Sequence, residues 1–173
     1  EDGAACLGSK IGVFHAGTSG NLCTLSFNGN KIATTGGGGA VLCQNETTAQ
    51  IVRHLSTTAR VAGSKYFDHD EIGFNYRMPN LNAALGTAQL DRLPIFLRAK
   101  RELGALYFDF FEQFDWLRPV MEGATRASNY WLNSVVLEES ITDKSGEIID
   151  LAATYGLSIR PVWRPLGDLA PYS

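Results

Sequence analysis

The chain has 173 residues, a length that fits one domain, and its 45% hydrophobic content is enough to form a buried core. Its formal net charge of −3, with 19% charged residues, excludes the strongly basic surface typical of nucleic-acid-binding proteins and of proteins held at membranes by clustered lysines. No uninterrupted apolar run approaches the roughly 20 residues that span a bilayer, and we see no secretory leader pattern, so we expect a cytoplasmic protein.

The first half of the chain is predicted to contain two strands, a helix and a long loop. Short apolar runs predict buried strands at 22–28 (LCTLSFN) and 40–44 (AVLCQ), on either side of a loop that carries Lys31 and four consecutive glycines. Asn45 is suited to cap a helix, and the apolar spacing after it predicts about twelve helical residues. Residues 61–78 show little periodicity and are expected to form an ordered loop.

The second half is predicted to be helical at first and then mixed. From Pro79 the apolar spacing predicts a long helix with a break or kink at Pro94. Residues 129–138 (NYWLNSVVLE) predict a strand, 144–156 a helix that ends at its glycine, and 157–163 (LSIRPVW) another strand. We therefore expect a β-rich segment, a helical connector and a small α+β end.

Neither the cysteines nor the histidines of the chain indicate a metal site or a disulfide framework. Its three cysteines, an odd number, form no CxxC pair, which suits a reducing compartment. The acidic stretch DHDE at 68–71 has adjacent side chains that do not converge on one ion in an extended loop. We expect no metal, and we assign no partner to His54.

The loop between the two predicted strands has the residue types of a cofactor site. Partial burial of Lys31 would remove solvation from its ammonium form, so that the neutral amine could form a Schiff base with a carbonyl. Glycines let a backbone approach a ligand closely, and their N–H groups can bind a phosphate. Ser26 adds a hydroxyl and Asp2 an acid for a ring nitrogen, which are the roles that pyridoxal phosphate requires. The residue types alone leave a plain solvated loop charge as the alternative.

Two longer motifs, SFNGNKIATTGGGGAVL and GFNYRMPNLNAALGTAQLDRL, resemble the DegT/StrS family of pyridoxal-phosphate-dependent nucleotide-sugar aminotransferases. The likeness extends to EDGAACLGS, HAGTSGNLCTLSF and SIRPVWRPL, in family order, and so covers essentially the whole chain. Family members are roughly twice as long, so the resemblance implies a chain truncated at its N-terminus that corresponds to their C-terminal half.

The resemblance implies a role for several residues. Lys31 is similar to the lysine that carries the cofactor, Asp2 to the acid at its ring nitrogen, and Ser26 to a donor to its phosphate. Asn75 would reach the phosphate in the neighbouring subunit's site, which requires a homodimer. The presence of lysine rather than histidine at position 31 favours amino transfer over the deoxygenating branch of the family. Arg77 and Arg160 are weaker expectations for substrate binding, because surface ion pairs explain such arginines equally well.

The resemblance also implies a fold and a reaction. The fold would be α/β: part of a type I pyridoxal-phosphate transferase large domain with a mostly parallel sheet (1–93), a connecting helix (94–118), and an incomplete small α+β lobe (119–173). One strand, directly after Lys31, would be antiparallel. The reaction would move an amino group, from glutamate, to a nucleotide-linked keto sugar for surface polysaccharides. The alternatives are a truncated, inactive fragment that at most dimerises, and a module that binds nucleotide sugars without chemistry.

Overall fold

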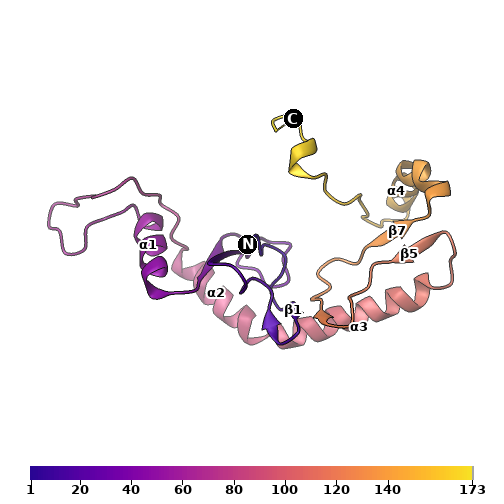
Figure 1. Cartoon of the computed structure of the whole chain (residues 1–173), viewed down its shortest axis with the longest axis horizontal. Coiled ribbons are helices and arrows are strands. Elements are labelled where there is room, and N and C mark those ends of the chain that lie inside the picture. Colours follow the sequence, from indigo (N-terminus) through magenta and orange to yellow (C-terminus); the bar gives the residue numbers. More distant parts are fainter. Residues whose placement is uncertain (173) are drawn as a thin grey trace. The chain divides into compact units, whose positions relative to one another are not determined.

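The structure, a computed structural model, describes residues 1–172 and divides into two compact units (Figure 1). The first unit comprises residues 1–107 and 121–133, and the second comprises 108–120 and the chain from 134 onward. Each unit is therefore built from two separate stretches of sequence. The three-part division at residues 93 and 118 stays a prediction.

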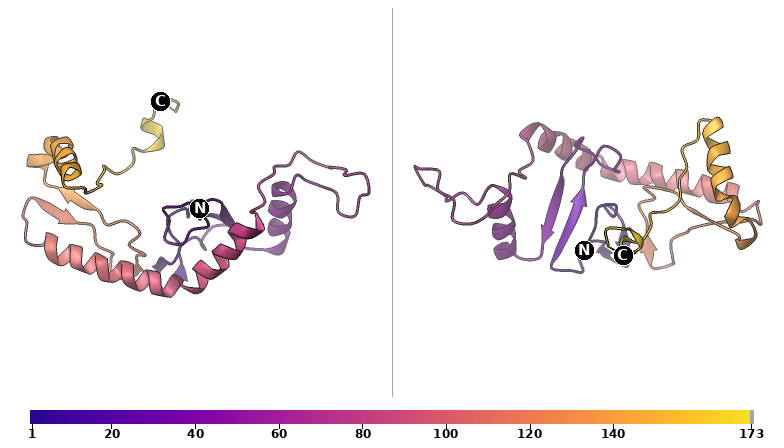
Figure 2. Two further views of the ribbon diagram at one scale, coloured as in Figure 1. Left: turned by 180° about the vertical axis from the view of Figure 1, so that it is seen from behind. Right: turned by 90° about the horizontal axis from the view of Figure 1, so that it is seen from above.

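An antiparallel hairpin organises the first unit. Strand β3 (Leu22–Ser26) pairs with β4 (Gly39–Cys43), with Ser26 opposite Gly39 at the end that carries the connecting loop. The two strands lie side by side in the right view of Figure 2. A Cβ atom on Gly39 would lie 2.3 Å from the carbonyl oxygen of Leu25, so the strands approach too closely there for any other residue. The hairpin confirms both predicted strands and the antiparallel strand after Lys31.

The other sheets are also antiparallel, which corrects the expectation of a mostly parallel sheet. The remaining strands are β1 (Lys10–Ile11), β2 (Phe14–His15), β5 (Leu117–Pro119), β6 (Arg126–Ala127) and β7 (Val135–Leu137). Strand β1 pairs antiparallel with β2 and β6, and β5 pairs antiparallel with β7. Within residues 1–172, parallel pairing is confined to one bridge, between Asp2 and Thr24. Parallel neighbours need a crossover connection of a dozen or more residues, and the β1–β2 turn is far too short for one.

The helices up to residue 111 lie where the sequence predicts them. Helix α1 (Glu46–Ser56) follows Asn45, whose side-chain oxygen accepts the Thr48 backbone N–H at 2.8 Å. Helices α2 (Asn80–Asp91) and α3 (Leu93–Phe111) form the long helical stretch. The break falls at Arg92, two residues before the expected Pro94, because proline is tolerated in the first turn of a helix. Of the helices within residues 1–172, none is long and apolar enough to cross a membrane.

The second unit contains the predicted helix but fewer strand residues than predicted. Besides β5 and β7 it holds two 3-10 helices, η1 (Glu139–Lys144) and η2 (Leu166–Asp168), and helix α4 (Ser145–Thr154). The predicted strand at 129–138 is reduced to β7, and Tyr130, with a φ of +43°, cannot continue an extended chain. Residues 157–163 form no strand, because no neighbouring strand among the described residues pairs with them.

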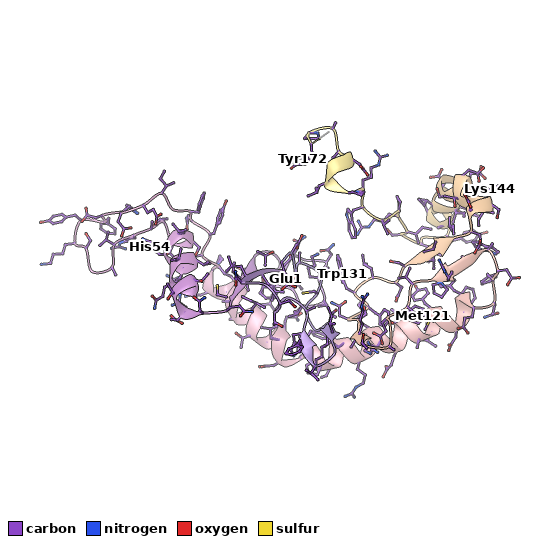
Figure 3. All side chains as sticks on the ribbon, viewed as in Figure 1. Glu1, His54, Met121, Trp131, Lys144 and Tyr172 are labelled. Atoms are coloured by element: carbon purple, nitrogen blue, oxygen red, sulfur yellow. The ribbon has the colours of Figure 1, made fainter. Side chains whose placement is uncertain are left out.

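The long loop after α1 is tied back to the end of that helix. The His54 Nε2 atom lies 2.6 Å from Asp70 Oδ1, and His69 Nδ1 lies 2.7 Å from the carbonyl oxygen of Thr58. Figure 3 shows His54 on α1. The expectation that His54 has no partner is therefore wrong. Its partner is a carboxylate of the acidic stretch at 68–71, and the contact ties the loop to α1. Within residues 1–172, no three His, Cys, Asp or Glu side chains form a metal-binding group.

Residues 121–133, which we call the return segment, bind the start of the chain through one buried amide. Asn129 is only 4% exposed, and its Nδ2 donates to the carbonyl oxygens of Ala5 (2.8 Å) and Leu7 (2.9 Å). Its Oδ1 accepts the backbone N–H of Trp131 at 3.0 Å, and its own N–H donates to Ser9 Oγ. Every polar atom of the buried side chain thus has a partner, as burial requires.

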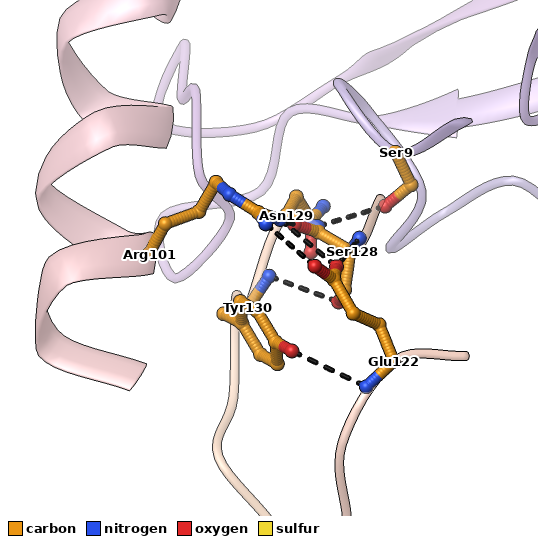
Figure 4. A network of polar contacts seen from close by, with 6 residues as sticks. All are labelled: Ser9, Arg101, Glu122, Ser128, Asn129 and Tyr130. Atoms are coloured by element: carbon orange, nitrogen blue, oxygen red, sulfur yellow. Dashed lines mark hydrogen bonds and ion pairs between the residues drawn. The ribbon is translucent and has the colours of Figure 1, made fainter. Parts of the chain in front are cut away.

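A forked ion pair ties the return segment to α3. Arg101 donates from Nη1 and Nη2 to the two carboxylate oxygens of Glu122, and its Nη1 also donates to the Ser128 carbonyl at 2.7 Å (Figure 4). The Ser128 N–H donates to Glu122 Oε2. Hydrogen bonds from Arg101 hold the pKa of the Glu122 carboxyl below its ordinary value, and the same bonds raise the pKa of Arg101.

The lowered pKa of Glu122 predicts a loss of stability in acid. A carboxyl whose pKa is lower in the folded chain contributes stability that is fully present above its unfolded pKa, about 4.5, and is lost as the pH falls through the folded value. We expect Glu122→Gln to unfold more easily than wild type at pH 7, and the two stabilities to converge in acid. Urea unfolding from pH 3 to pH 7 measures this, with Arg101→Gln as the matched variant. A constant difference across that pH range would contradict the role of the pair.

Candidate functional site

Lys31 lies in a closed turn between β3 and β4. Its backbone N–H donates to the carbonyl of Asn28 at 3.0 Å. The turn closes on Phe27, whose N–H donates to the Gly38 carbonyl and whose carbonyl accepts the Thr35 N–H, both at 3.0 Å. These bonds fix the backbone from which the lysine side chain projects.

Helix α2 holds the same turn from the side. The side-chain amide of Asn82 donates to the Thr35 carbonyl at 2.6 Å, and the Thr34 N–H donates to Gln89 Oε1 at 3.4 Å. Both side chains come from one helix, at positions seven residues apart, which places them on the same face. The motif that follows Pro79 in the sequence therefore positions the lysine turn.

The glycines after Lys31 have different surroundings. Gly36 and Gly38 have φ values of +80° and +96°, a conformation that favours glycine. A Cβ atom on Gly38 would meet the Met78 side chain at 2.9 Å, whereas nothing lies within 4 Å of the equivalent position on Gly36 or Gly37. Gly38 and Gly39 are thus required by the fold, while Gly36 and Gly37 border open space.

The Lys31 side chain is half-buried and lies against an aromatic ring. Its Nζ atom is 4.0 Å from the centroid of the Trp131 ring, within the range of a cation–π contact. Beside the pair is a hollow of about 340 Å³. This volume lies near the lower limit of the range for small-molecule pockets. Its lining consists of Asn30, Lys31, Ile32, Phe96, Ala99, Lys100, Leu103 and Trp131.

Asp2 and Ser26 lie on one face of β3. The parallel bridge places Asp2 beside Thr24, and side chains two residues apart on a strand point to the same face, so Asp2 and Ser26 share that face. Asp2 is exposed, and its Oδ1 accepts the Ala4 N–H at 3.0 Å. Ser26 Oγ accepts the Asn28 N–H at 3.3 Å. Neither residue lines the hollow beside Lys31.

The other predicted site residues are exposed. Asn75 forms an antiparallel bridge with Thr57, and Arg77 follows it in the same loop. Arg160 lies in the second unit, with its guanidinium 5.4 Å from the centroid of the Trp163 ring. The strand expected to carry Arg160 does not form.

Sequence reasoning missed Trp131, which the structure places beside Lys31. Its indole N–H donates to the Asn30 carbonyl at 2.6 Å, and its own carbonyl accepts from Lys100 Nζ at 3.2 Å. Figure 3 shows Trp131 in the return segment. Because Trp131 follows Lys31 by 100 residues, no local pattern links the two; the residue was assigned to a strand instead.

Comparisons with known proteins agree on one family. The model of the DegT/DnrJ/EryC1/StrS aminotransferase family matches residues 1–173. EpsN of Bacillus subtilis, provisionally named a pyridoxal phosphate-dependent aminotransferase, is 35% identical over 166 residues, which are 96% of this chain and 42% of EpsN. The GDP-perosamine synthase of Vibrio cholerae is 31% identical over 99% of this chain and 46% of its own length.

A solved structure shows the same fold. The crystal structure of the aminotransferase TlmJ from Streptoalloteichus hindustanus matches with a TM-score of 0.90 and 26% identity, over 100% of this chain and 46% of TlmJ. The chain spans less than half the length of each of these relatives. The expected α/β fold, a part of the aminotransferase fold, is confirmed, although its described strand ladders are antiparallel. The chain belongs to the DegT/DnrJ/EryC1/StrS aminotransferase family.

Proposed function

We propose that the protein is a pyridoxal-phosphate-dependent aminotransferase that moves an amino group from glutamate to a nucleotide-linked keto sugar, in the cytoplasm, for surface polysaccharide synthesis. The observation that carries the proposal is the family match over residues 1–173, with Lys31 half-buried in the turn after β3. The similarity to a GDP-perosamine synthase supports a nucleotide-linked sugar as the acceptor.

The residues present offer the chemical groups that the cofactor requires. When bound, pyridoxal phosphate supplies an aldehyde that bonds reversibly to amines and a ring that accepts electrons. Lys31 offers the amine, on a backbone fixed by the turn, and would then carry a proton as general base and acid. The exposed carboxylate of Asp2 would hold a proton at the ring nitrogen, and the Ser26 hydroxyl on the same face of β3 would donate to the phosphate.

Three further residues belong to the proposal. The exposed Asn75 would donate to the cofactor phosphate of a second copy of the chain, which makes the proposed assembly a homodimer. Arg77, exposed two residues later, and Arg160, exposed in the second unit, would bind anionic groups of the substrate.

The length of the chain favours a second candidate function for residues 1–173 by themselves. They span less than half of each of these relatives, so more than half of each relative has no counterpart in residues 1–173. Residues 1–173 alone would then dimerise or bind a nucleotide sugar without turnover. Amino transfer from glutamate by the 173-residue chain would contradict this candidate.

An absorption experiment tests the proposed function. The intact protein is mixed with pyridoxal phosphate, the spectrum is recorded, and glutamate is then added. We expect a new band near the visible edge that glutamate bleaches and a GDP- or UDP-linked 4-keto sugar restores. A spectrum that is only the sum of the protein and free cofactor would contradict the proposal. Sedimentation of the same preparation gives its oligomeric state, and an active monomer would contradict the role of Asn75.

A further inference from the structure

An aromatic ring, that of Trp131, lies under the Lys31 ammonium. We propose that Trp131 is a positioning residue that docks the Lys31 ammonium whenever this amine is not bonded to the cofactor. The inference rests on the proposed function, because only a cofactor that bonds to Lys31 gives the amine a bonded state and a released state. It adds to that function a residue that acts only through its contact with the Lys31 amine.

The contact between the two residues has the geometry of a dock. The Lys31 Nζ lies 4.0 Å from the centroid of the Trp131 ring, and tryptophan offers the strongest ring face for a cation. Both side chains are half-buried, so water screens the attraction less than at an open surface. The hollow of about 340 Å³ beside them leaves the lysine side chain room to leave the ring.

One hydrogen bond holds the Trp131 ring, and two more hold the Trp131 backbone. The indole N–H donates to the carbonyl of Asn30, the residue before Lys31, at 2.6 Å. The backbone carbonyl of Trp131 accepts from Lys100 Nζ on α3, and its N–H donates to the buried Asn129 side chain. The ring is thus tied both to the lysine turn and to the return segment. A fixed ring next to a lysine with four rotatable side-chain bonds is suited to hold the amine in one position.

A purely structural role for Trp131 would give different results. If the ring only packed against the turn, its removal would lower stability and leave the surroundings of the lysine ammonium unchanged. A dock also affects the amine: loss of a contact worth about 0.5–1 kcal/mol would free the amine for reaction about two- to fivefold faster.

The first measurement observes the amine without any cofactor. Reductive methylation of the intact protein with ¹³C-formaldehyde places dimethyl groups on its lysines, and the Lys31 signal is the one missing from Lys31→Arg. We expect this signal to be shifted upfield by the Trp131 ring and to move to the position of exposed lysines in Trp131→Leu. Trp131→Phe, which keeps a ring but loses the indole N–H, should retain part of the shift. The matched control is Trp116→Leu, which alters a tryptophan of the second unit and should leave the position of the Lys31 signal unchanged.

The second measurement follows the reaction of unmodified Lys31 with pyridoxal phosphate, in which Lys31 Nζ loses a proton, bonds to the aldehyde carbon, and water leaves. Stopped-flow absorbance should show capture about two- to fivefold faster in Trp131→Leu. An unchanged Lys31 signal in Trp131→Leu, equal loss of the shift in the Phe and Leu variants, or unchanged or slower capture would overturn the dock. A ring shift with no capture in any variant would instead overturn the proposed function and leave the contact intact.

Discussion

Replacement of Lys31 by alanine should abolish the covalent capture of pyridoxal phosphate and reduce amino transfer by about 10²–10⁴-fold or more. The variant removes the amine that bonds to the cofactor and the group that moves the proton, and the backbone of the turn stays fixed by its own hydrogen bonds. The measurement is the absorption band near the visible edge, followed by the rate of its bleaching by glutamate.

Two variants sharpen the test of Lys31. Lys31→Arg keeps a cation next to Trp131 but offers no amine that can bond to an aldehyde, so it should be as inactive as the alanine variant. Lys65→Ala removes an exposed lysine from the loop after α1 and should retain the band. A band that persists in Lys31→Ala would assign the cofactor to another lysine and contradict the proposed site.

Replacement of Asn129 by alanine should cause the largest loss of stability of any single change in the return segment. The variant removes the partner of the Ala5 and Leu7 carbonyls and of the Trp131 N–H, in three partly buried hydrogen bonds. An unpaired buried polar group costs about 1–3 kcal/mol, and the lower end of that range applies to partly buried groups, so we expect a loss of about 3 kcal/mol for the three bonds together. For a chain of this length this corresponds to a melting temperature lower by about 6–12 °C.

The Asn129 prediction has an internal comparison. Asn129→Asp keeps the shape of the side chain but places an oxygen opposite the two carbonyls, so it should be at least as unstable as the alanine variant. Asn21→Ala alters an exposed asparagine and should stay within about 0.5 kcal/mol of wild type. Thermal unfolding followed by circular dichroism gives all three values, and a stable Asn129→Asp would contradict the hydrogen-bond assignment.

Local signals in the sequence were sufficient for the helices and the hairpin. Asn45 predicts the start of α1 because its cap depends on a residue three positions away, and Gly156, with a φ of +74°, follows α4 as expected. The two-residue strands β1, β2 and β6 were not predicted, since such short segments are defined only by their partners. Residues 157–163 show the converse: a strand-like pattern forms no strand without a neighbour to pair with.

The sequence predicted those site residues that lie in one motif or beside one strand. Lys31, with Ser26 five residues before it, carries a signal in the motif itself, and the bridge from Asp2 to Thr24 brings the acid to the same strand. Trp131 could not be found in this way, because its contact with Lys31 depends on how Asn129 anchors the return segment. A buried asparagine looks like any other asparagine in a sequence, and its partners are backbone atoms that carry no sequence signal.

The distant bonds of Asn129 also determine when the first unit can close. They join residues 120, 122 and 124 positions apart. Residues 5–9 therefore cannot form these bonds until the ribosome has synthesised Asn129. At about 5–20 residues per second this delay is on the order of ten seconds, long compared with the formation of α1 or the β3–β4 hairpin. During translation, residues 4–9 would therefore remain accessible to chaperones long after α1 and the β3–β4 hairpin have formed.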